Sequence, residues 1–513
     1  MDEKRGMTRH KRVKSVGGLW AIITVFSTSL YVYFRAQHYS KTSVPEITTN
    51  QEPSPGSFKL QSIYRHGVGE NAYMQVLDVN DEVLKAAKVK FSEFSMSSLE
   101  ADNELWSSNS NYATENPLDY EFGLSCEPLV LKRMLYRDPE FVESYMDYAH
   151  ENSHMASKVH LDWIDETVLV PNVTDKKTIV SLALMSSNAY VRLPHTKDWR
   201  NLTSPWNHTE NPGHGWDDDG LRGHVFSNKR QDIVVIAVKG TSAQGLAGSG
   251  EDETTVNDKI NDNLLFSCCC ARVSYLWTTV CDCYVKSYTC DEVCLERELR
   301  RKDRYYKAVL NIYKEVARQY PSSTIWVTGH SLGGALGSLL GRTYGLPVVA
   351  FEAPGELMAS RRLHLPMPPG YPNYLEGVWH FGNTGDPIFM GTCNGASSSC
   401  SIGGYAMETS CHTGKECVYD VVKEKGWRVS LFNHRIHKVI DEILETYDAP
   451  ARCTPPGPCH DCFNWEYIKK ETSSIAPPTM TITSSTPTTI TSEPTITSSC
   501  IGRNWYGWCT EYD

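Results

Sequence analysis

The sequence feature that most restricts the fold is the pentapeptide 329–333, Gly-His-Ser-Leu-Gly, which lies between an apolar run and a helical segment. A Gly-x-Ser-x-Gly pattern is weak alone, but between a strand and a helix it predicts a sharp turn in which only glycine avoids collisions. This turn would lift Ser331 out of a sheet as a nucleophile. It would also place the Leu332 amide at a helix N-terminus, where it can stabilise an oxyanion.

Apolar runs and helical segments alternate on both sides of this pentapeptide. Residues 233–238 (Ile-Val-Val-Ile-Ala-Val) form a continuous run, typical of a strand buried on both faces. Strands that alternate with helices predict a parallel α/β sheet. The other expected strands are 325–327, 347–351 and one within 378–387, and the expected helices are 296–319 and 334–344.

A serine nucleophile needs a base and an acid, which after such a turn usually follow in the order acid, then histidine. The predicted strand within 378–387 ends in a turn that carries Asp386, our preferred acid. Glu352, just after the preceding strand, is the competing acid. A purely structural Asp-Pro turn at Asp386 is the alternative interpretation.

Two histidines downstream are candidates for the base. His434 and His437 are three residues apart and are therefore expected to be neighbours on one helical face. We prefer His434, because the start of a helix can be reached over the sheet edge by its connecting loop. His437 would then pack or cap.

A second oxyanion donor is expected in the loop that follows the strand 233–238. Gly240 allows close backbone approach there, and the Thr241 amide is the candidate donor, with an ordinary turn as the alternative. The insertion 243–295 follows, with three successive cysteines, 268–270, and apolar groups on either side of them. This insertion could form a lid over the nucleophile or a wall held by disulfides.

The N-terminus predicts a membrane anchor. Residues 1–15 hold six basic and two acidic side chains, and the apolar run 16–34 is long enough to cross the roughly 30 Å hydrocarbon core. No small-residue cleavage site follows the run, which favours an uncleaved anchor over a signal peptide. The preceding cations place the N-terminus in the cytosol and the remaining chain in a lumen.

Composition agrees with a lumenal globule. Seventeen cysteines favour an oxidising compartment, and acceptor sequons occur at Asn172, Asn201 and Asn207. The net charge of −11 argues against nucleic acid as a partner, and the mean hydropathy of −0.39 argues against a polytopic membrane protein. The expected layout is a tether 35–57, a lumenal domain 58–470, a Ser/Thr/Pro-rich disordered stalk 471–499, and a disulfide-closed loop 500–513.

Two other functions fit parts of the sequence. His150, Glu151 and His154 match H-E-x-x-H, which is typical of zinc proteases. However, Ser157 replaces the glycine of the longer three-histidine form of that pattern, so an exposed helix is the favoured interpretation. A catalytically inactive binding glycoprotein is the other alternative, because a fold does not fix a function.

The segments 329–335, 239–241 and 383–387 together resemble class 3 lipases. More closely, the cysteine-rich insertion, the segments 391–400 and 432–437, and the N-terminal anchor look like the family of fungal autophagy-related vacuolar lipases. This resemblance implies an α/β-hydrolase fold, with Ser331 as nucleophile, Asp386 as acid and His434 as base. The insertion departs from the simple lid helix of class 3 lipases, so the lid cannot be transferred.

The resemblance also implies where the protein acts and on what. Members of this family are single-pass type II membrane glycoproteins that travel from the endoplasmic reticulum through multivesicular bodies to the vacuole. There it is expected to hydrolyse phospholipids, phosphoinositides included, and to lyse autophagic bodies and intralumenal vesicles. The expected function is therefore a serine lipase or phospholipase whose partners are membrane lipids. A serine hydrolase of this kind needs no metal or organic cofactor.

Overall fold

The computed structural model describes the main part of the compact unit Pro55–Asp513. The predicted cytosolic segment 1–15, anchor 16–34, most of the tether and the stalk 471–499 lie outside the described residues. Among those described, no helix has the length and apolar content needed to span a bilayer. The described residues are 56–68, 74–85, 118–152, 155, 158–190, 200–201, 220–241, 255–272, 279–469, 500–503 and 509–512, with only the backbone described at 200–201, 255, 500–503 and 509–512.

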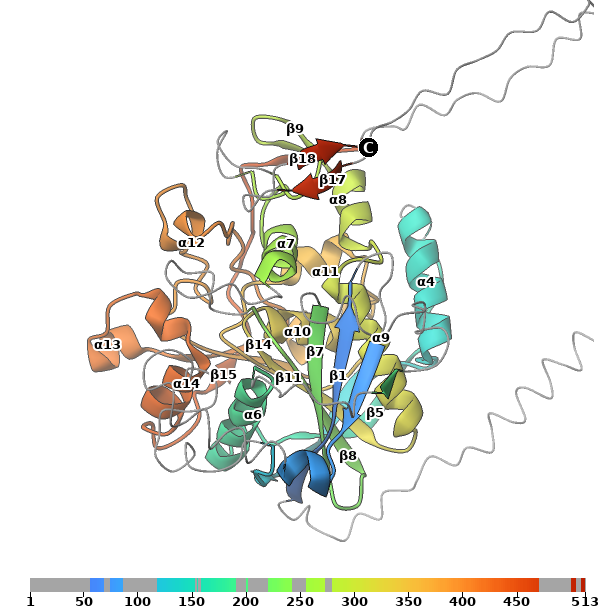
Figure 1. Ribbon diagram of the computed structural model, residues 1–513, viewed down its shortest axis with the longest axis vertical. Coiled ribbons are helices and arrows are strands. Elements are labelled where there is room, and N and C mark those ends of the chain that lie inside the picture. The colour runs from blue at the N-terminus through green and yellow to red at the C-terminus, as the bar shows by residue number, and fades with distance from the viewer. Residues whose placement is uncertain are drawn as a thin grey trace, which may run out of the picture. The chain divides into compact units, whose positions relative to one another are not determined.

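A mixed sheet of eleven strands forms the centre of this unit (Figure 1). Its order is β15-β14-β13-β12-β11-β8-β7-β1-β2-β6, with β3 beside β1, and the neighbours from β8 to β14 are parallel. The other pairs in the sheet are antiparallel. The strands are β1 (Gly56–Gly67), β2 (Met74–Asp78), β3 (Phe122–Leu124), β6 (Arg200–Asn201), β7 (Gly220–Asn228), β8 (Ile233–Val238), β11 (Thr324–His330), β12 (Val348–Phe351), β13 (Val378–Asn383), β14 (Lys415–Tyr419) and β15 (Cys453–Thr454).

Helices cover both faces of the parallel strands, and the side chains of β8 show how. Val234, Ile236 and Val238 belong to one core cluster, together with α9 and α10, whereas Ile233 and Val235 belong to a second cluster with α6. Both sets are almost fully buried. The prediction of a strand buried on both faces is therefore confirmed.

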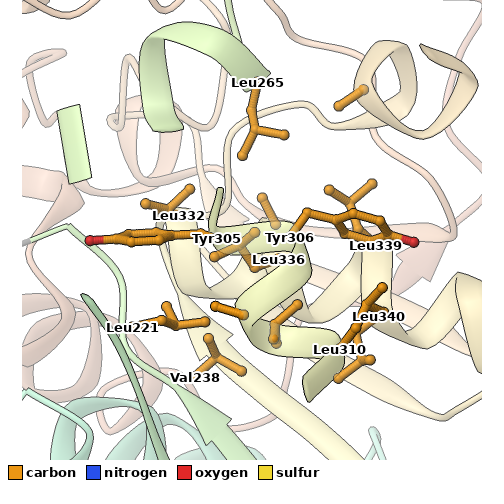
Figure 2. Packing of buried hydrophobic residues seen from close by; sticks show 14 of the residues in the cluster. Leu221, Val238, Leu265, Tyr305, Tyr306, Leu310, Leu332, Leu336, Leu339 and Leu340 are labelled. Atoms are coloured by element: carbon orange, nitrogen blue, oxygen red, sulfur yellow. The ribbon is translucent and has the colours of Figure 1, made fainter. Parts of the chain in front are cut away.

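Leucines of α10 and residues of α9 form the centre of the first cluster (Figure 2). The helices are α4 (Pro139–Glu151), α6 (Lys176–Asn188), α7 (Thr255–Leu265), α8 (Glu292–Leu299), α9 (Tyr305–Gln319), α10 (Leu332–Tyr344), α11 (Leu357–Arg362), α12 (Ser399–Ile402), α13 (Val421–Lys425) and α14 (Ile436–Val439), with short turns η3 (Asn373–Leu375), η4 (Leu431–His434) and η5 (Ile440–Leu444).

The helix predicted over 296–319 is two helices. Asp291 caps α8 through the Cys294 amide, and the Cys283–Cys294 disulfide ties α8 to the cysteine-rich insertion. The helix α9 starts afresh at Tyr305 and packs on the sheet. The disulfide holds the first helix to the insertion, whereas the second packs on the sheet, so the segment forms two helices and not one.

Smaller sheets and disulfides complete the unit. The sheets pair β4 (Cys126–Met134) with β5 (Trp163–Pro171), β10 (Thr289–Asp291) with both β9 (Tyr284–Lys286) and β16 (Glu466–Ile468), and β17 (Cys500–Arg503) with β18 (Cys509–Tyr512). The side chains of Cys500 and Cys509 lie outside the described ones, so their predicted disulfide does too. The disulfides are 268–462, 269–290, 270–281, 283–294, 393–400, 411–459 and 417–453.

Candidate active site

Ser331 lies in the turn between β11 and α10, with φ +58° and ψ −131°. A β-carbon at Gly333 would lie 2.1 Å from the Val238 carbonyl oxygen, and one at Gly329 would lie 2.5 Å from the Gly333 carbonyl. Only glycine therefore allows this turn to close. The Ser331 amide donates to the Phe351 carbonyl at 3.0 Å, which fixes the turn to β12.

The three residues predicted for catalysis meet at this turn. His434 Nε2 lies 2.8 Å from Ser331 Oγ, and His434 Nδ1 lies 2.7 Å from Asp386 Oδ2. Asp386 is fully buried, whereas Ser331 and His434 keep a small exposed fraction. The structure thus brings together a hydroxyl, an imidazole and a carboxylate from segments 48 and 103 residues apart. Such an arrangement can take a proton from Ser331 and stabilise the imidazolium that forms.

Asp386 and Glu352 form a coupled pair of buried carboxyl groups. Burial, the charge of Asp386 and a hydrogen bond to it raise the pKa of Glu352 well above its ordinary value. Burial opposes ionisation of Asp386 as well, but His434, Glu352 and the Ile388 amide together lower its pKa. Glu352 is therefore the protonated member, and its hydroxyl donates to the ionised Asp386. Glu352, the competing candidate for the catalytic acid, therefore contacts Asp386, and it is Asp386 that contacts His434.

The prediction that His434 lies at the start of a helix is wrong. His434 is the last residue of the turn η4, and α14 begins two residues later with His437 in its first turn. Two asparagines that the sequence analysis did not single out hold this turn in place. Asn383 Nδ2 donates to the Asn433 carbonyl at 3.1 Å, and Asn433 Nδ2 donates to the Gly385 carbonyl at 3.0 Å. These bonds join the Asp386 turn to the His434 turn.

The loop after β8 lies against the Ser331 turn. A β-carbon at Gly240 would lie 2.3 Å from the His330 carbonyl oxygen and 3.3 Å from the Gly333 amide. Thr241, the next residue, donates its hydroxyl to Asp262 of α7 at 2.6 Å. Burial raises the pKa of Asp262 to about 8. The loop that holds the predicted second oxyanion donor is therefore anchored by the insertion.

His330 is a second histidine beside the base. Its Nε2 lies 2.7 Å from the His434 carbonyl oxygen, and its Nδ1 lies 2.8 Å from the Tyr190 hydroxyl. Burial lowers the pKa of His330 to about 3. A neutral ring can then donate from Nε2 and accept at Nδ1, which positions the His434 backbone. The sequence analysis did not predict a role for His330, and its position within the pentapeptide 329–333 was the one feature that could have indicated it.

The described part of the insertion is a wall more than a lid. Leu265, Phe266 and the cysteines 268–270 are buried in the first core cluster. Three disulfides close within the insertion, and the fourth joins Cys268 to Cys462. The aromatic segment 275–277 lies outside the described residues.

The remaining sequence-predicted residues lie elsewhere. Asn172 is in a turn between β5 and α6, where its side chain accepts from the amide and hydroxyl of Thr174. The side chains of Asn201 and Asn207 lie outside the described ones. The helix α4 ends at Glu151 and Asn152 caps it, and His154, the second histidine of H-E-x-x-H, lies outside the described residues. His150 instead faces Glu296 and His364.

A sheet that is parallel around a strand-serine-helix turn, with serine, aspartate and histidine in that chain order, defines the α/β-hydrolase class. Residues 253–344 match the family described as Lipase (class 3). Proteins assigned the name lipase ATG15 are 58% identical in Saccharomyces cerevisiae strain YJM789 (98% of both chains) and 57% identical in Kluyveromyces lactis (96% of this chain, 97% of the relative). The chain belongs to this family of ATG15 lipases.

A solved structure, that of Lip2 lipase from Yarrowia lipolytica, aligns with 48% of this chain and 80% of its own. Its sequence identity is 16% and the TM-score is 0.24. The family assignment rests on the relatives that match along nearly the whole chain.

Proposed function

We propose that the chain is a serine lipase that hydrolyses carboxylic esters of membrane phospholipids or acylglycerols, with Ser331 as nucleophile, His434 as base and Asp386 as acid. The observation that carries this proposal is the pair of contacts of His434, 2.8 Å to Ser331 Oγ and 2.7 Å to Asp386 Oδ2. The membership in a lipase family supports the ester as substrate.

The reaction proceeds in two halves. His434 removes the Ser331 proton as Oγ attacks the ester carbonyl, and the Leu332 and Thr241 amides stabilise the tetrahedral oxyanion. Collapse of this intermediate expels the alcohol, which takes the proton from His434 and leaves an acyl-enzyme. Water, deprotonated by the same histidine, then releases the fatty acid and restores Ser331.

The substrate reaches this site from a membrane. We infer a single-pass type II protein anchored by residues 16–34, with its lumenal unit at the multivesicular body and in the vacuole. Support comes from the basic residues before the apolar run, and from the disulfides, which need an oxidising compartment. Lysis of autophagic bodies and intralumenal vesicles is the cellular role that this placement favours.

The test of the site compares the full chain, purified in detergent, with Ser331→Ala and with Ser338→Ala. Ser338 lies in α10, the helix that follows Ser331, is buried, and donates to the Gly334 carbonyl at 2.9 Å. Ser338→Ala is therefore a matched control for the removal of a serine hydroxyl. Wild type and Ser338→Ala should hydrolyse phospholipid vesicles and a soluble short-chain ester, and Ser331→Ala neither. Equal activity in Ser331→Ala would refute the mechanism.

The membrane proposals have their own tests. Cleavage of the soluble ester without the vesicles would keep the nucleophile and refute phospholipid as substrate. Carbonate extraction should leave the wild type in the membrane fraction and should release the variant that lacks residues 16–34. Without glycosidase treatment, Asn172→Gln should migrate faster than the wild type by one glycan, and treatment should abolish the difference, because a lumenal sequon is the one that is modified. An unchanged mobility would argue against modification at Asn172.

A further inference from the structure

A second cluster of titratable side chains lies away from the catalytic triad, where three chain segments meet. Glu356 is the residue before α11, His380 is in the middle of β13, and His412 precedes β14. Glu356 and His380 are fully buried, and His412 is 3% exposed. His380 Nε2 lies 3.2 Å from Glu356 Oε1, and His412 Nδ1 lies 3.5 Å from Glu356 Oε2. One ligand atom of each residue falls within 4.8 Å of those of the other two.

These atoms are close together but are not joined by well-directed hydrogen bonds. Among the described residues, Glu356 Oε2, His412 Nδ1 and both ring nitrogens of His380 are buried without a hydrogen-bond partner. An unsatisfied buried polar atom destabilises the folded state, so several in one place require an explanation. A single ion placed between them would bind Glu356 Oε2, His412 Nδ1 and one ring nitrogen of His380 together.

Neighbouring groups direct the free lone pairs into the cluster. His412 Nε2 donates to the Phe389 carbonyl at 3.3 Å, which leaves Nδ1 without a proton in the neutral ring. The Thr413 amide and hydroxyl donate to Glu356 Oε1, which leaves Oε2 available. This is the outer arrangement that orients histidine and carboxylate ligands around metals.

The spacing also fits a metal centre. Zinc holds nitrogen and oxygen ligands at about 2.0–2.2 Å, which in tetrahedral geometry puts the ligand atoms about 3.3–3.6 Å apart. The separation of His412 Nδ1 from Glu356 Oε2, 3.5 Å, agrees with this value, and His380 Nε2 lies 3.2 Å from the other oxygen of the same carboxylate. Histidine nitrogen and glutamate oxygen are both ordinary zinc ligands.

We propose that Glu356, His380 and His412 bind a divalent transition-metal ion, zinc, as a structural centre that ties α11, β13 and the segment before β14 together. The centre is buried, uses these three protein ligands, and takes no part in ester hydrolysis. It stabilises the strand from which the Asp386 turn leaves the sheet. The proposal does not depend on the reaction assigned to Ser331.

The test measures metal content in the full chain, produced through the secretory pathway and purified in detergent without chelators. Elemental mass spectrometry should find about one zinc per chain in wild type, and nearly none in His380→Asn or His412→Asn. His364→Asn is the matched control, since His364 belongs to the other histidine-carboxylate cluster, with His150 and Glu296, and its loss should leave the zinc in place.

A second measurement covers variants that fail to fold. Zinc-edge X-ray absorption of the wild type should show two imidazole ligands and oxygen, and removal of the zinc by prolonged dialysis against dipicolinate should lower the melting temperature until zinc is returned. Zinc-free wild type, zinc retained in His380→Asn and His412→Asn, zinc lost in His364→Asn, a sulfur-rich shell, or an unchanged melting temperature after zinc removal would each overturn the proposal.

Discussion

At the scale of single residues, the active site depends on two kinds of constraint. Ser331 adopts a positive φ of +58°, which a residue with a β-carbon rarely takes, and the glycines around it provide the space. Asp386 is kept ionised in a fully buried position by His434 on one side and by a protonated Glu352 on the other. One constraint is steric and the other electrostatic, so they can be tested separately.

The first prediction separates the two carboxyl groups. Asp386→Asn should lower kcat roughly 10³–10⁴-fold, because an amide stabilises the wrong tautomer of the histidine. Glu352→Gln should lower kcat less than about tenfold, since an amide N–H can still donate to Asp386. Steady-state hydrolysis of a soluble ester measures both. If Glu352→Gln were as damaging as Asp386→Asn, Glu352 would be more than a supporting donor.

The second prediction concerns the steric constraint. Gly333→Ala should abolish ester hydrolysis and lower the melting temperature, because its β-carbon would lie 2.1 Å from the Val238 oxygen and 2.7 Å from the Lys239 carbonyl carbon. Both obstacles are backbone atoms, so the two segments would have to separate. Gly457→Ala is the control, since no atom lies within 4 Å of its added β-carbon. A fully active Gly333→Ala enzyme would contradict this account.

The reacting residues could be predicted from the sequence, but their supports could not. Ser331, Asp386 and His434 each follow a recognisable local pattern and occur in the expected chain order. Asn383 and Asn433 support each other's turns across 50 residues, and Asp262 holds Thr241 across 21. An asparagine or aspartate has no local pattern that reveals a distant partner. Such contacts become visible only in the folded chain.

At the scale of elements, four of the five parallel strands were predictable, whereas β14 and the antiparallel half were not. The strands β8, β11, β12 and β13 are short, apolar and separated by helices, so their patterns are clear. β1 mixes exposed and buried residues over twelve positions with a register shift between Leu60 and Ser62. A bulge breaks the alternation on which a strand prediction depends. For the same reason of weak pattern, the sequence predicts a helix start at His434, where the structure has the one-turn η4.

The third prediction concerns α7, which carries the buried Asp262. Its pKa of about 8 exceeds the ordinary value of about 3.9 in an unfolded chain, so its contribution to stability is complete below pH 4 and is lost as pH rises toward 8. The free energy of unfolding should therefore fall between pH 5 and pH 8, by at most about 4 kcal/mol from this group. Denaturant titrations across that range measure the fall.

Asp262→Asn provides the control for this pH dependence. The amide oxygen can still accept from the Thr241 hydroxyl, but the side chain no longer titrates. The variant should show a shallower loss of stability with pH and keep its activity at pH 5. A slope equal to that of the wild type would mean that Asp262 is ionised at neutral pH.

At the scale of the whole molecule, one disulfide joins parts of the chain that the sheet does not pair. Cys268 and Cys462 are 194 residues apart, and their bond ties the middle of the cysteine-rich insertion to the C-terminal end of the described lumenal domain. Cys393 and Cys400 enclose only a short loop, with a separation of 7 residues. Among the cysteines whose side chains are described, Cys126 is the free one. The sequence indicated an oxidising compartment, but cysteine spacing alone could not give these pairs.

The fourth prediction compares the long and the short link. Replacing Cys268 and Cys462 with alanine should lower the free energy of unfolding by about 5 kcal/mol, against about 2.5 kcal/mol for Cys393 and Cys400, because a longer closed loop restricts the unfolded chain more. Denaturant unfolding of the two double variants at one pH gives the comparison. A larger loss for the short loop would show that native contacts, not chain entropy, determine the effect.

The strand register of β8 and the internal disulfides of the insertion differ in how they tolerate a change of chain length. The residues of β8 alternate between two cores, so the gain or loss of one residue there would send every following side chain to the wrong face. The parallel strands can therefore diverge by substitution but hardly by change of length. The insertion carries three of its own covalent links. Descendants of this chain can lengthen or shorten its loops, and so vary what surrounds Ser331, while the strand register that places Ser331 is inherited intact.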